Sequence, residues 1–222
     1  MKHLITVIVF MITMGVSSQE KIILPEEFIG IEISRGLRTS LIPANEDKVV
    51  IQGKNSDKIQ VKVDNGILKV RSGHAQLLES DDTIVEIYFK YVLAIDARHN
   101  SKIYLRKKLK QPLLKLTARE GASIFADIEV ENIVANSVTD GSIILTGSAD
   151  IQEIEVKSGA YRGENLIGEN INVVLKGQGT ANIYAKKYVN AMALAGGQIY
   201  IYGNPEEIHE KTSFGGSIKK IN

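Results

Sequence analysis

The sequence predicts an all-β protein in which N-terminal antiparallel strands continue into a parallel β-helix, or β-solenoid. Helical periodicity is almost absent, and short runs of Ile, Val, Leu and Tyr alternate with polar residues between Gly, Asn, Asp and Pro. Thirteen of the 19 glycines lie after residue 100, and six of them recur every 18 to 20 residues. A repeat near 19 residues with one glycine is typical of a stacked β-solenoid. A length of 222 residues with 44% hydrophobic content is enough for one well-cored domain.

Residues 1–18 are predicted to be a signal peptide. A positively charged start precedes an apolar core, Leu4–Val16, that is too short to span a bilayer comfortably. The small residues Ser17 and Ser18 then suit a signal peptidase, with cleavage before Gln19. An uncleaved anchor is the alternative. No later stretch approaches 18 consecutive apolar residues, so we expect no integral membrane segment in the mature chain.

Within the mature domain, residues 19–222, residues 28–97 are predicted to form an antiparallel β meander. Two alternating runs flank Asp64-Asn65-Gly66, which is a strong signal for a tight hairpin. The alternating runs that predict strands occupy residues 30–34, 48–53, 57–63, 66–72 and 83–91.

Residues 98–222 are predicted to form about six rungs of the β-helix. A single rung cannot bury its own apolar face, whereas coils stacked about 4.8 Å apart bury a continuous core. We expect glycine at the turns because it tolerates positive φ. An antiparallel sandwich with evenly spaced turns is the alternative fold. The recurring glycines are Gly121, Gly141, Gly159, Gly179, Gly197 and Gly216.

Alignment of the rungs on the Ile that follows each glycine predicts an outward column of aromatic side chains, because neighbouring residues of a strand point to opposite faces. Three interpretations remain open. The rings could stabilise the fold by cross-rung contacts, lie under a loop or a partner protein, or form a platform for sugar rings. The candidate contact residues are Tyr104, Phe125, Tyr184, Tyr200 and Tyr202.

Composition excludes several classes of function. The chain has no Cys, which excludes thiolate metal sites, iron–sulfur clusters, disulfides and thiol catalysis. Its 27 basic and 26 acidic side chains nearly cancel, which gives no electrostatic footprint for nucleic acid. The histidines show no metal-binding spacing, and no catalytic or phosphate-binding motif occurs. We therefore expect no cofactor, no metal and no nucleic-acid partner.

Two charged features keep other chemistry open. Glu120 and Asp140 each precede a rung glycine and would stack one rung apart, as a cation site or the acids of a polysaccharide-processing enzyme would. Acidic residues beside glycines are also common in solvated turns. The basic cluster Arg106-Lys107-Lys108 with Lys110 is interpreted either as a solvated turn or as a contact for an acidic glycan.

The chain resembles the bacterial head GIN domain family, a domain of unknown function described as a "putative auto-transporter adhesin". The resemblance rests on Phe28–Ile33, Val63–Val70, the glycine-punctuated repeats, and the ending Tyr200–Pro205 that closes at Gly215–Ile218. It covers essentially the whole mature chain. It implies a secreted or periplasmic β-solenoid of Bacteroidetes-type envelopes with a role in adhesion, and it brings no catalytic residues. Because no translocator follows the last rung, we expect a free periplasmic or released protein.

These inferences together predict an exported, non-enzymatic cell-envelope protein, an adhesin-like binding module for a glycan or an envelope protein. Two alternatives remain. One is a polysaccharide-processing β-helix enzyme, and the other is a periplasmic structural or stress-response module that assembles into a homo-oligomer.

Overall fold

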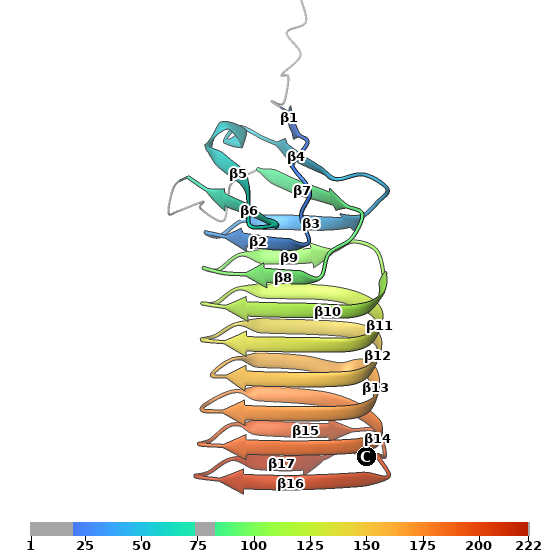
Figure 1. Ribbon diagram of the computed structural model, residues 1–222. Coiled ribbons are helices and arrows are strands. Elements are labelled where there is room, and N and C mark those ends of the chain that lie inside the picture. Colours follow the sequence, from blue (N-terminus) through green and yellow to red (C-terminus); the bar gives the residue numbers. More distant parts are fainter. Residues whose placement is uncertain (1–19, 74–82, 222) are drawn as a thin grey trace, which may run out of the picture.

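The strands of the protein wind into a stack of coils around one continuous core (Figure 1). The computed structural model describes residues 20–73 and 83–221. The predicted signal peptide, residues 1–18, lies outside the described residues. Nearly all the regular structure is β, and the one helix in the described ranges is a short 3-10 turn.

The elements follow each other along the chain with short connections. They are β1 (Glu20–Ile23), β2 (Gly30–Ser34), β3 (Arg38–Pro43), β4 (Lys48–Gln52), η1 (Ser56–Lys58), β5 (Ile59–Asp64), β6 (Ile67–Ser72), β7 (Ile84–Phe89), β8 (Ala94–Ala97), β9 (Lys102–Leu105), β10 (Leu109–Arg119), β11 (Ser123–Val138), β12 (Ser142–Lys157), β13 (Ala160–Lys176), β14 (Thr180–Leu194), β15 (Gln198–Tyr202), β16 (Glu207–Ser213) and β17 (Ser217–Lys220).

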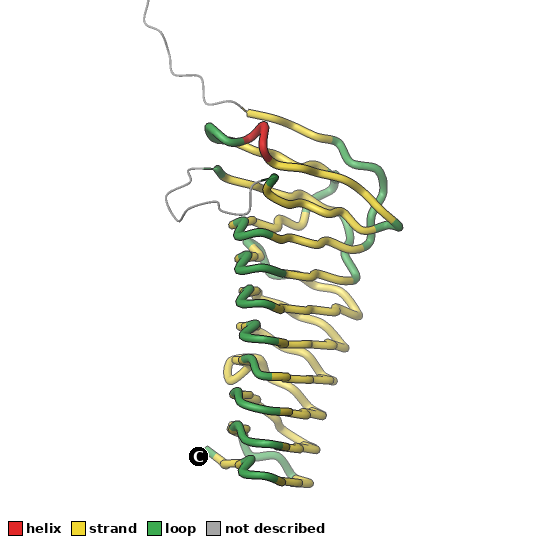
Figure 2. Tube along the Cα trace, turned by 90° about the vertical axis from the view of Figure 1, so that its left-hand side faces the viewer, coloured by secondary structure: helices red, strands yellow, loops and turns green. Residues whose placement is uncertain are grey.

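The long strands β11 to β14 each bend halfway and so contribute to both sides of a flattened coil (Figure 1). Neighbouring coils pair in parallel: Ser123 lies beside Ser142, Ser142 beside Ala160, and Ala160 beside Thr180. The tight turns line up along one edge of the stack (Figure 2). The prediction of a parallel β-helix with a repeat of about 19 residues is confirmed, with about seven turns.

The predicted antiparallel strands are also found near the N-terminus. Strand β1 pairs antiparallel with β4, β4 with β7, and β5 with β6 through the predicted hairpin at Asp64-Asn65-Gly66. Strands β2 and β3, however, pair in parallel with β8 and β9, about 60 residues later in the chain. The first coil therefore begins at Gly30, and β4 to β7 extend the stack beyond it.

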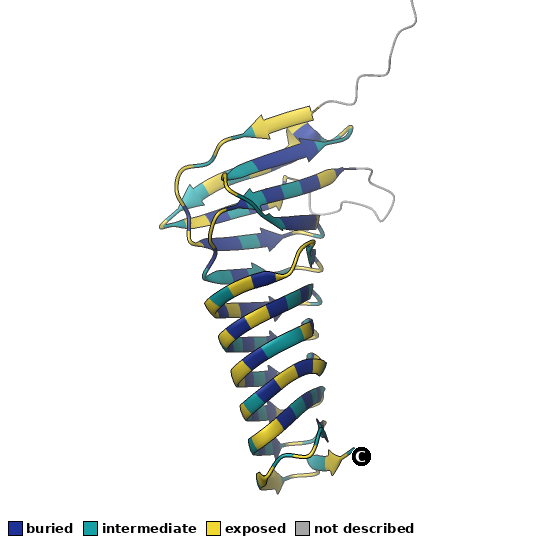
Figure 3. Ribbon diagram, turned by 90° about the vertical axis from the view of Figure 1, so that its right-hand side faces the viewer, coloured by how far each residue is buried: buried dark blue, intermediate teal, exposed yellow. Residues whose placement is uncertain are grey.

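The core consists of inward side chains that stack from coil to coil, and Figure 3 shows buried and more exposed residues alternating along the strands. Burial of this apolar column removes each coil's inner surface from water, and it is the main favourable term in the stability of the fold. One inner column contains Ile95, Leu116, Ala135, Ile154, Val173 and Ala191, and the facing one contains Ile103, Ile124, Ile143, Tyr161, Ala181 and Ile199.

The turn glycines serve backbone angle in some coils and space in others, and the expected positive φ is found at Gly121 (74°) and Gly197 (75°). The expectation based on positive φ is wrong for Gly141, because Thr139 (44°) and Asp140 (59°) take the left-handed conformation in that turn. A Cβ on Gly141 would overlap the carbonyl group of Ala118 in the preceding coil. Close stacking of backbones at the turn therefore excludes a side chain. The same place in later coils is taken by Gly159, Gly179, Gly197 and Gly216.

The coil that begins at Ala160 carries a tyrosine inside the core. Tyr161 is fully buried in the column of isoleucines, and its hydroxyl donates a hydrogen bond to Oε1 of the buried Gln152 at 3.1 Å. The Gln152 amide in turn donates to the carbonyl oxygens of Ala149 and Leu166. Burial raises the pKa of Tyr161. Gly163 leaves room for the ring, because a Cβ there would lie 2.6 Å from Cε1 of Tyr161.

Candidate ligand-binding face

The β-helix has two broad outer surfaces over the same core. We call the first the aromatic face: the outward side chains of β3, β9, β15, β17 and the first halves of β11 to β14. We call the second the polar face: the outward side chains of β8, β16, the later part of β10 and the second halves of β11 to β14. All five predicted contact residues lie on the aromatic face, and all five are partly exposed.

Tyr104 and Phe125 form the best-defined aromatic contact of this face. They are direct partners in the parallel register of β9 and β11, and their rings stack with centroids 4.9 Å apart and planes 5° from parallel. This centroid separation matches the roughly 4.8 Å spacing of neighbouring strands, as expected for rings stacked along the coil axis. The register continues to Ser40 on one side and Ile144 on the other.

The predicted column is not continuous. Beyond Ile144 the same register position is taken by Arg162 and Asn182, and only then by Tyr200. Phe125 and Tyr200 are four coils apart, about 19 Å at a strand spacing of roughly 4.8 Å. The aromatic face therefore carries two separate aromatic patches.

Alignment of the rungs on the Ile after each glycine places Ile183 opposite Ile199 and so Tyr184 opposite Tyr200, which is wrong by two residues. Tyr184 pairs with Tyr202, and the residue opposite Tyr200 is Asn182. The alignment assumed an Ile after each turn, but the core position in this coil is filled by Ala181. Tyr184 and Tyr202 thus form a second column beside Tyr200.

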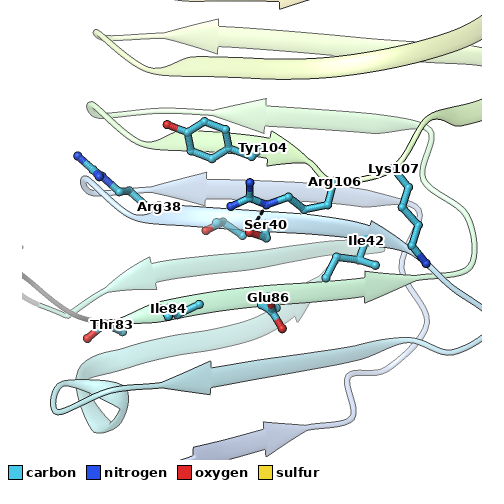
Figure 4. Close-up of a pocket in the computed structure, with 10 residues that line it drawn as sticks. Arg38, Ser40, Ile42, Thr83, Ile84, Glu86, Tyr104, Arg106 and Lys107 are labelled. Atoms are coloured by element: carbon cyan, nitrogen blue, oxygen red, sulfur yellow. Dashed lines mark hydrogen bonds between the residues drawn. The ribbon is translucent and has the colours of Figure 1, made fainter.

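A groove of about 900 Å³ opens beside Tyr104 (Figure 4). Strand β3 contributes Arg38, Ser40 and Ile42 to its wall, and β7 contributes Ile84 and Glu86. These strands lie next to β9 because β3 pairs with both β7 and β9. Arg106 and Lys107, directly after β9, complete the wall together with Thr39 and Thr83.

Arg106 is held over the edge of this groove by two contacts. Its Nε donates a hydrogen bond to Oγ of Ser40 at 2.9 Å, and its guanidinium lies 5.2 Å from the centroid of the Tyr104 ring. Both contacts leave the two terminal nitrogens of the guanidinium without a recorded partner in the described part of the chain. Sequence reasoning found Arg106 through its basic cluster, but nothing in the sequence connected it to Ser40 or to Arg38.

A smaller hollow of about 410 Å³ lies at the second aromatic patch. Tyr200 and Tyr202 form one wall, with Arg162, Glu164 and Asn182 around them. Glu164 belongs to a short stretch of β13 that has no partner on β14, where the register shifts. Glu164 Oε2 and Asn182 Oδ1 are covered acceptors without a donor among the described residues. Such acceptors are normally satisfied by water or a ligand.

The predicted acid pair is not assembled. Arg119 pairs with Val138, so Glu120 lies beside Thr139 and not beside Asp140. The carboxylate of Glu120 instead lies 3.0 Å from Nε2 of His99. In the part of the chain that the structure describes, no three His, Asp or Glu residues gather as metal ligands would.

The basic cluster is divided between two environments. Lys108 pairs with Asp127 at 3.5 Å, and Lys110 pairs with Glu129 at 2.8 Å, a hydrogen bond that lowers the pKa of Glu129. Arg106 and Lys107 have no acidic partner among the described residues and line the groove.

Several side chains of the polar face pair with each other from coil to coil. Asn172 donates to the Glu153 carboxylate at 2.8 Å, and Asn190 donates to Oδ1 of Asn172 at 3.1 Å, which makes a ladder across three coils. Glu155 accepts from Lys176 at 2.9 Å and pairs with Lys157 at 3.1 Å. The hydrogen bond from Lys176 lowers the pKa of Glu155.

Comparison with known families identifies the domain. The sequence profile described as "Putative auto-transporter adhesin, head GIN domain" matches residues 27–205. The chain belongs to the head GIN domain family. No curated protein is significantly similar to it in sequence.

Solved structures share the head GIN fold along almost the whole chain. A putative adhesin from Bacteroides fragilis NCTC 9343 has a TM-score of 0.84 at 16% identity, covering 93% of this chain and 98% of that one. A putative adhesin from Parabacteroides merdae ATCC 43184 has a TM-score of 0.74 at 15% identity, covering 94% and 98%. A putative lipid binding protein from Parabacteroides distasonis ATCC 8503 has a TM-score of 0.70 at 16% identity, also covering 94% and 98%. At such identities the likeness concerns the fold.

The described helical structure was also considered for its ability to cross a membrane. In residues 20–73 and 83–221 of this head GIN domain, no helix has the length and apolar character needed to cross a bilayer.

Proposed function

We propose that this head GIN domain protein is an exported, non-enzymatic binding protein of the cell envelope whose aromatic face holds a glycan. The family description as an adhesin and the predicted signal peptide support export and binding. The observation that carries the proposal is that the aromatic face keeps partly exposed rings beside polar groups that have no acidic partner among the described residues, as at Tyr104 and Arg106.

The chemistry of a sugar fits this combination. A pyranose ring presents a flat C–H surface that packs on an aromatic ring, while its hydroxyl groups need donors and acceptors at the rim of the same contact. Ligand sites in general combine an aromatic or apolar wall with a few polar groups that fix orientation. The groove at Tyr104 and the hollow at Tyr200 both have this composition.

Two patches on one face suit a chain of sugars better than a single sugar. Phe125 and Tyr200 lie about 19 Å apart, from four strand spacings of roughly 4.8 Å, a distance that an oligosaccharide of a few units spans. Simultaneous contact at both patches increases the apparent affinity, because the second contact forms at a high effective concentration. Individually weak contacts are then sufficient for adhesion.

Binding of the protein without its predicted signal peptide to a glycan array tests this proposal. The informative variant is Tyr104→Ala combined with Tyr200→Ala, which removes one ring from each patch. The matched control is Tyr188→Ala, because Tyr188 is a partly exposed tyrosine outside the aromatic face. Its ring lies against His209, 5.6 Å between centroids, and the register partner of His209 is Asn190, which belongs to the polar-face ladder.

We expect the wild type and Tyr188→Ala to bind the same glycans and the double variant to lose at least tenfold in affinity. A wild type that binds no glycan would contradict the proposal. So would a double variant that binds as well as the wild type while remaining folded by circular dichroism. Capture of a defined envelope protein by the aromatic face instead would favour a protein partner.

A further inference from the structure

The groove beside Tyr104 carries positive charge that no ion pair within residues 20–73 and 83–221 neutralises. Its wall contains three cations, Arg38, Arg106 and Lys107, and one carboxylate, Glu86. No ion pair of these cations is recorded among the described residues. Figure 4 shows Arg38 and Lys107 toward opposite ends of the groove with Arg106 between them.

The single carboxylate of the wall is hydrogen-bonded to a neighbouring tyrosine. The hydroxyl of Tyr88 donates a hydrogen bond to Oε2 of Glu86 at 3.0 Å, and this bond raises the pKa of Tyr88. Nζ of Lys48 lies over the Tyr88 ring, 4.7 Å from its centroid. Glu86 therefore belongs to a polar group with Tyr88 and Lys48, and Arg106 instead uses the neutral Ser40 as its partner.

The groove contrasts with the lysines that follow it in the chain. The whole chain has a formal net charge of only +1, and the neighbouring lysines of the same basic cluster, Lys108 and Lys110, each face a carboxylate. Within the basic cluster, Arg106 and Lys107 are thus the two cations with no acidic partner among the described residues, and together with Arg38 they line the groove that also holds the partly exposed aromatic stack. Electrostatic complementarity of this kind selects partners and speeds association.

We propose that the groove binds an acidic polysaccharide, one whose sugar rings carry carboxylate or sulfate groups. This inference rests on the proposed function and names the class of glycan. The planar guanidinium of Arg106, fixed by Ser40 and Tyr104, presents its two terminal nitrogens to an anionic group in a bidentate manner. The ring that carries this group packs on the Tyr104–Phe125 stack, and Arg38 and Lys107 contact the flanking charged units.

Matched ligands isolate the contribution of charge. The probes are hexagalacturonate with its fully methyl-esterified form, and dextran sulfate with unmodified dextran, each titrated calorimetrically into the protein without its predicted signal peptide. The informative variant is Arg38→Gln combined with Arg106→Gln. The control is Lys115→Gln combined with Lys211→Gln, which removes two exposed cations from the polar face.

We expect at least one acidic probe to bind tenfold or more tighter than its neutral counterpart, with an affinity that falls as salt rises from 50 to 500 mM. We expect the groove variant to lose that tenfold preference and the control variant to keep it. Equal affinity for charged and neutral probes, or an unchanged preference in the groove variant, would overturn the inference.

The outcomes separate this inference from the proposed function. If neutral glycans bind through Tyr104 as well as acidic ones do, the aromatic face still binds glycans and only the acidic specificity is wrong. If no glycan binds, both proposals fail. Binding to phosphatidylglycerol vesicles without binding to either acidic probe would overturn the inference in favour of a lipid headgroup.

Discussion

The aromatic face and the polar face of this β-helix cover one core but treat their outward groups differently. On the polar face, amides, carboxylates and lysines pair with each other from coil to coil, as the Asn190–Asn172–Glu153 ladder does. On the aromatic face, rings stack but Arg38, Arg106 and Lys107 have no acidic partner among the described residues. The difference teaches that a repeat fold can join many polar groups of one surface in contacts between coils while it places cations beside aromatic rings on the other.

Both faces depend on close coil stacking, and the largest expected effect comes from breaking it. Gly141→Ala places a methyl group against the Ala118 carbonyl in the preceding coil. We expect a loss of about 3 kcal/mol or more in the free energy of unfolding, because backbone cannot move aside cheaply. Gly215→Ala is the matched control: φ is +83° but the space is open. That change should cost about 1–2 kcal/mol. Urea unfolding of both variants measures the difference, and equal losses would contradict the packing explanation.

The interior under the aromatic face contains a polar contact whose removal should have the next largest effect. Tyr161→Phe leaves Oε1 of Gln152 without its donor. A buried unsatisfied acceptor costs roughly 1–3 kcal/mol, which thermal unfolding of the variant would measure. A variant as stable as the wild type would mean that water or a rotated Gln152 replaces the hydroxyl.

The same residue predicts sensitivity to alkaline pH. Burial raises the pKa of Tyr161 above its ordinary value of about 10. The folded state then holds the proton that the unfolded state releases, so this contribution is complete below pH ~10 and is lost as pH rises above it. The wild type should therefore lose more stability than Tyr161→Phe between pH 9 and 11. Parallel pH curves would contradict this.

The Tyr104–Phe125 stack decides whether the aromatic face is a structural device or an available surface. A double-mutant cycle with Tyr104→Leu and Phe125→Leu should give a coupling energy of about 0.5–1.5 kcal/mol, as for other aromatic pairs. Urea unfolding of the four proteins provides it. A coupling well above this range would make the stack primarily stabilising and would weaken the case for a ligand there.

The smallest effect is expected on the polar face. Glu155→Gln removes an exposed ion-pair acceptor, and such pairs contribute at most about 1 kcal/mol. Because the pKa of Glu155 is lowered in the folded state, its contribution is present above the ordinary glutamate pKa and is lost as pH falls through the folded pKa. The free energy of unfolding should therefore change less between pH 7 and pH 3 for Glu155→Gln than for the wild type. A large loss at pH 7 would mean that the polar face is not a set of weak, independent pairs.

Most of the fold could be predicted from the sequence because each coil repeats the same pattern of alternating apolar and polar residues with a glycine at the turn. Alternation fixes which side of each strand is buried, and the recurring glycines mark the turns where backbones stack. The hairpin at Asp64-Asn65-Gly66 was predictable for a local reason: its turn needs residues that adopt the left-handed conformation, and Asn and Gly do so readily.

The aromatic site was only partly predictable. The alternation of buried and outward residues predicts which side chains belong to the site. Which side chains are neighbours depends on the register between coils. The sequence does not reveal this register, because Tyr161 and Ala181 occupy the core position that Ile occupies in other coils. The groove depends on pairing between β3 and β9, which are far apart in the chain. No local pattern could place Arg38 near Arg106.

The most direct test of the central claim compares the two faces in one sample. Nitration of tyrosines with tetranitromethane, with and without the acidic polysaccharide and read by mass spectrometry, reports the accessibility of each ring. The account predicts that ligand protects Tyr104 on the aromatic face, and Tyr200 to a smaller extent, and leaves Tyr188 unchanged. Protection of Tyr188, or equal modification of Tyr104 with and without bound ligand, would contradict it.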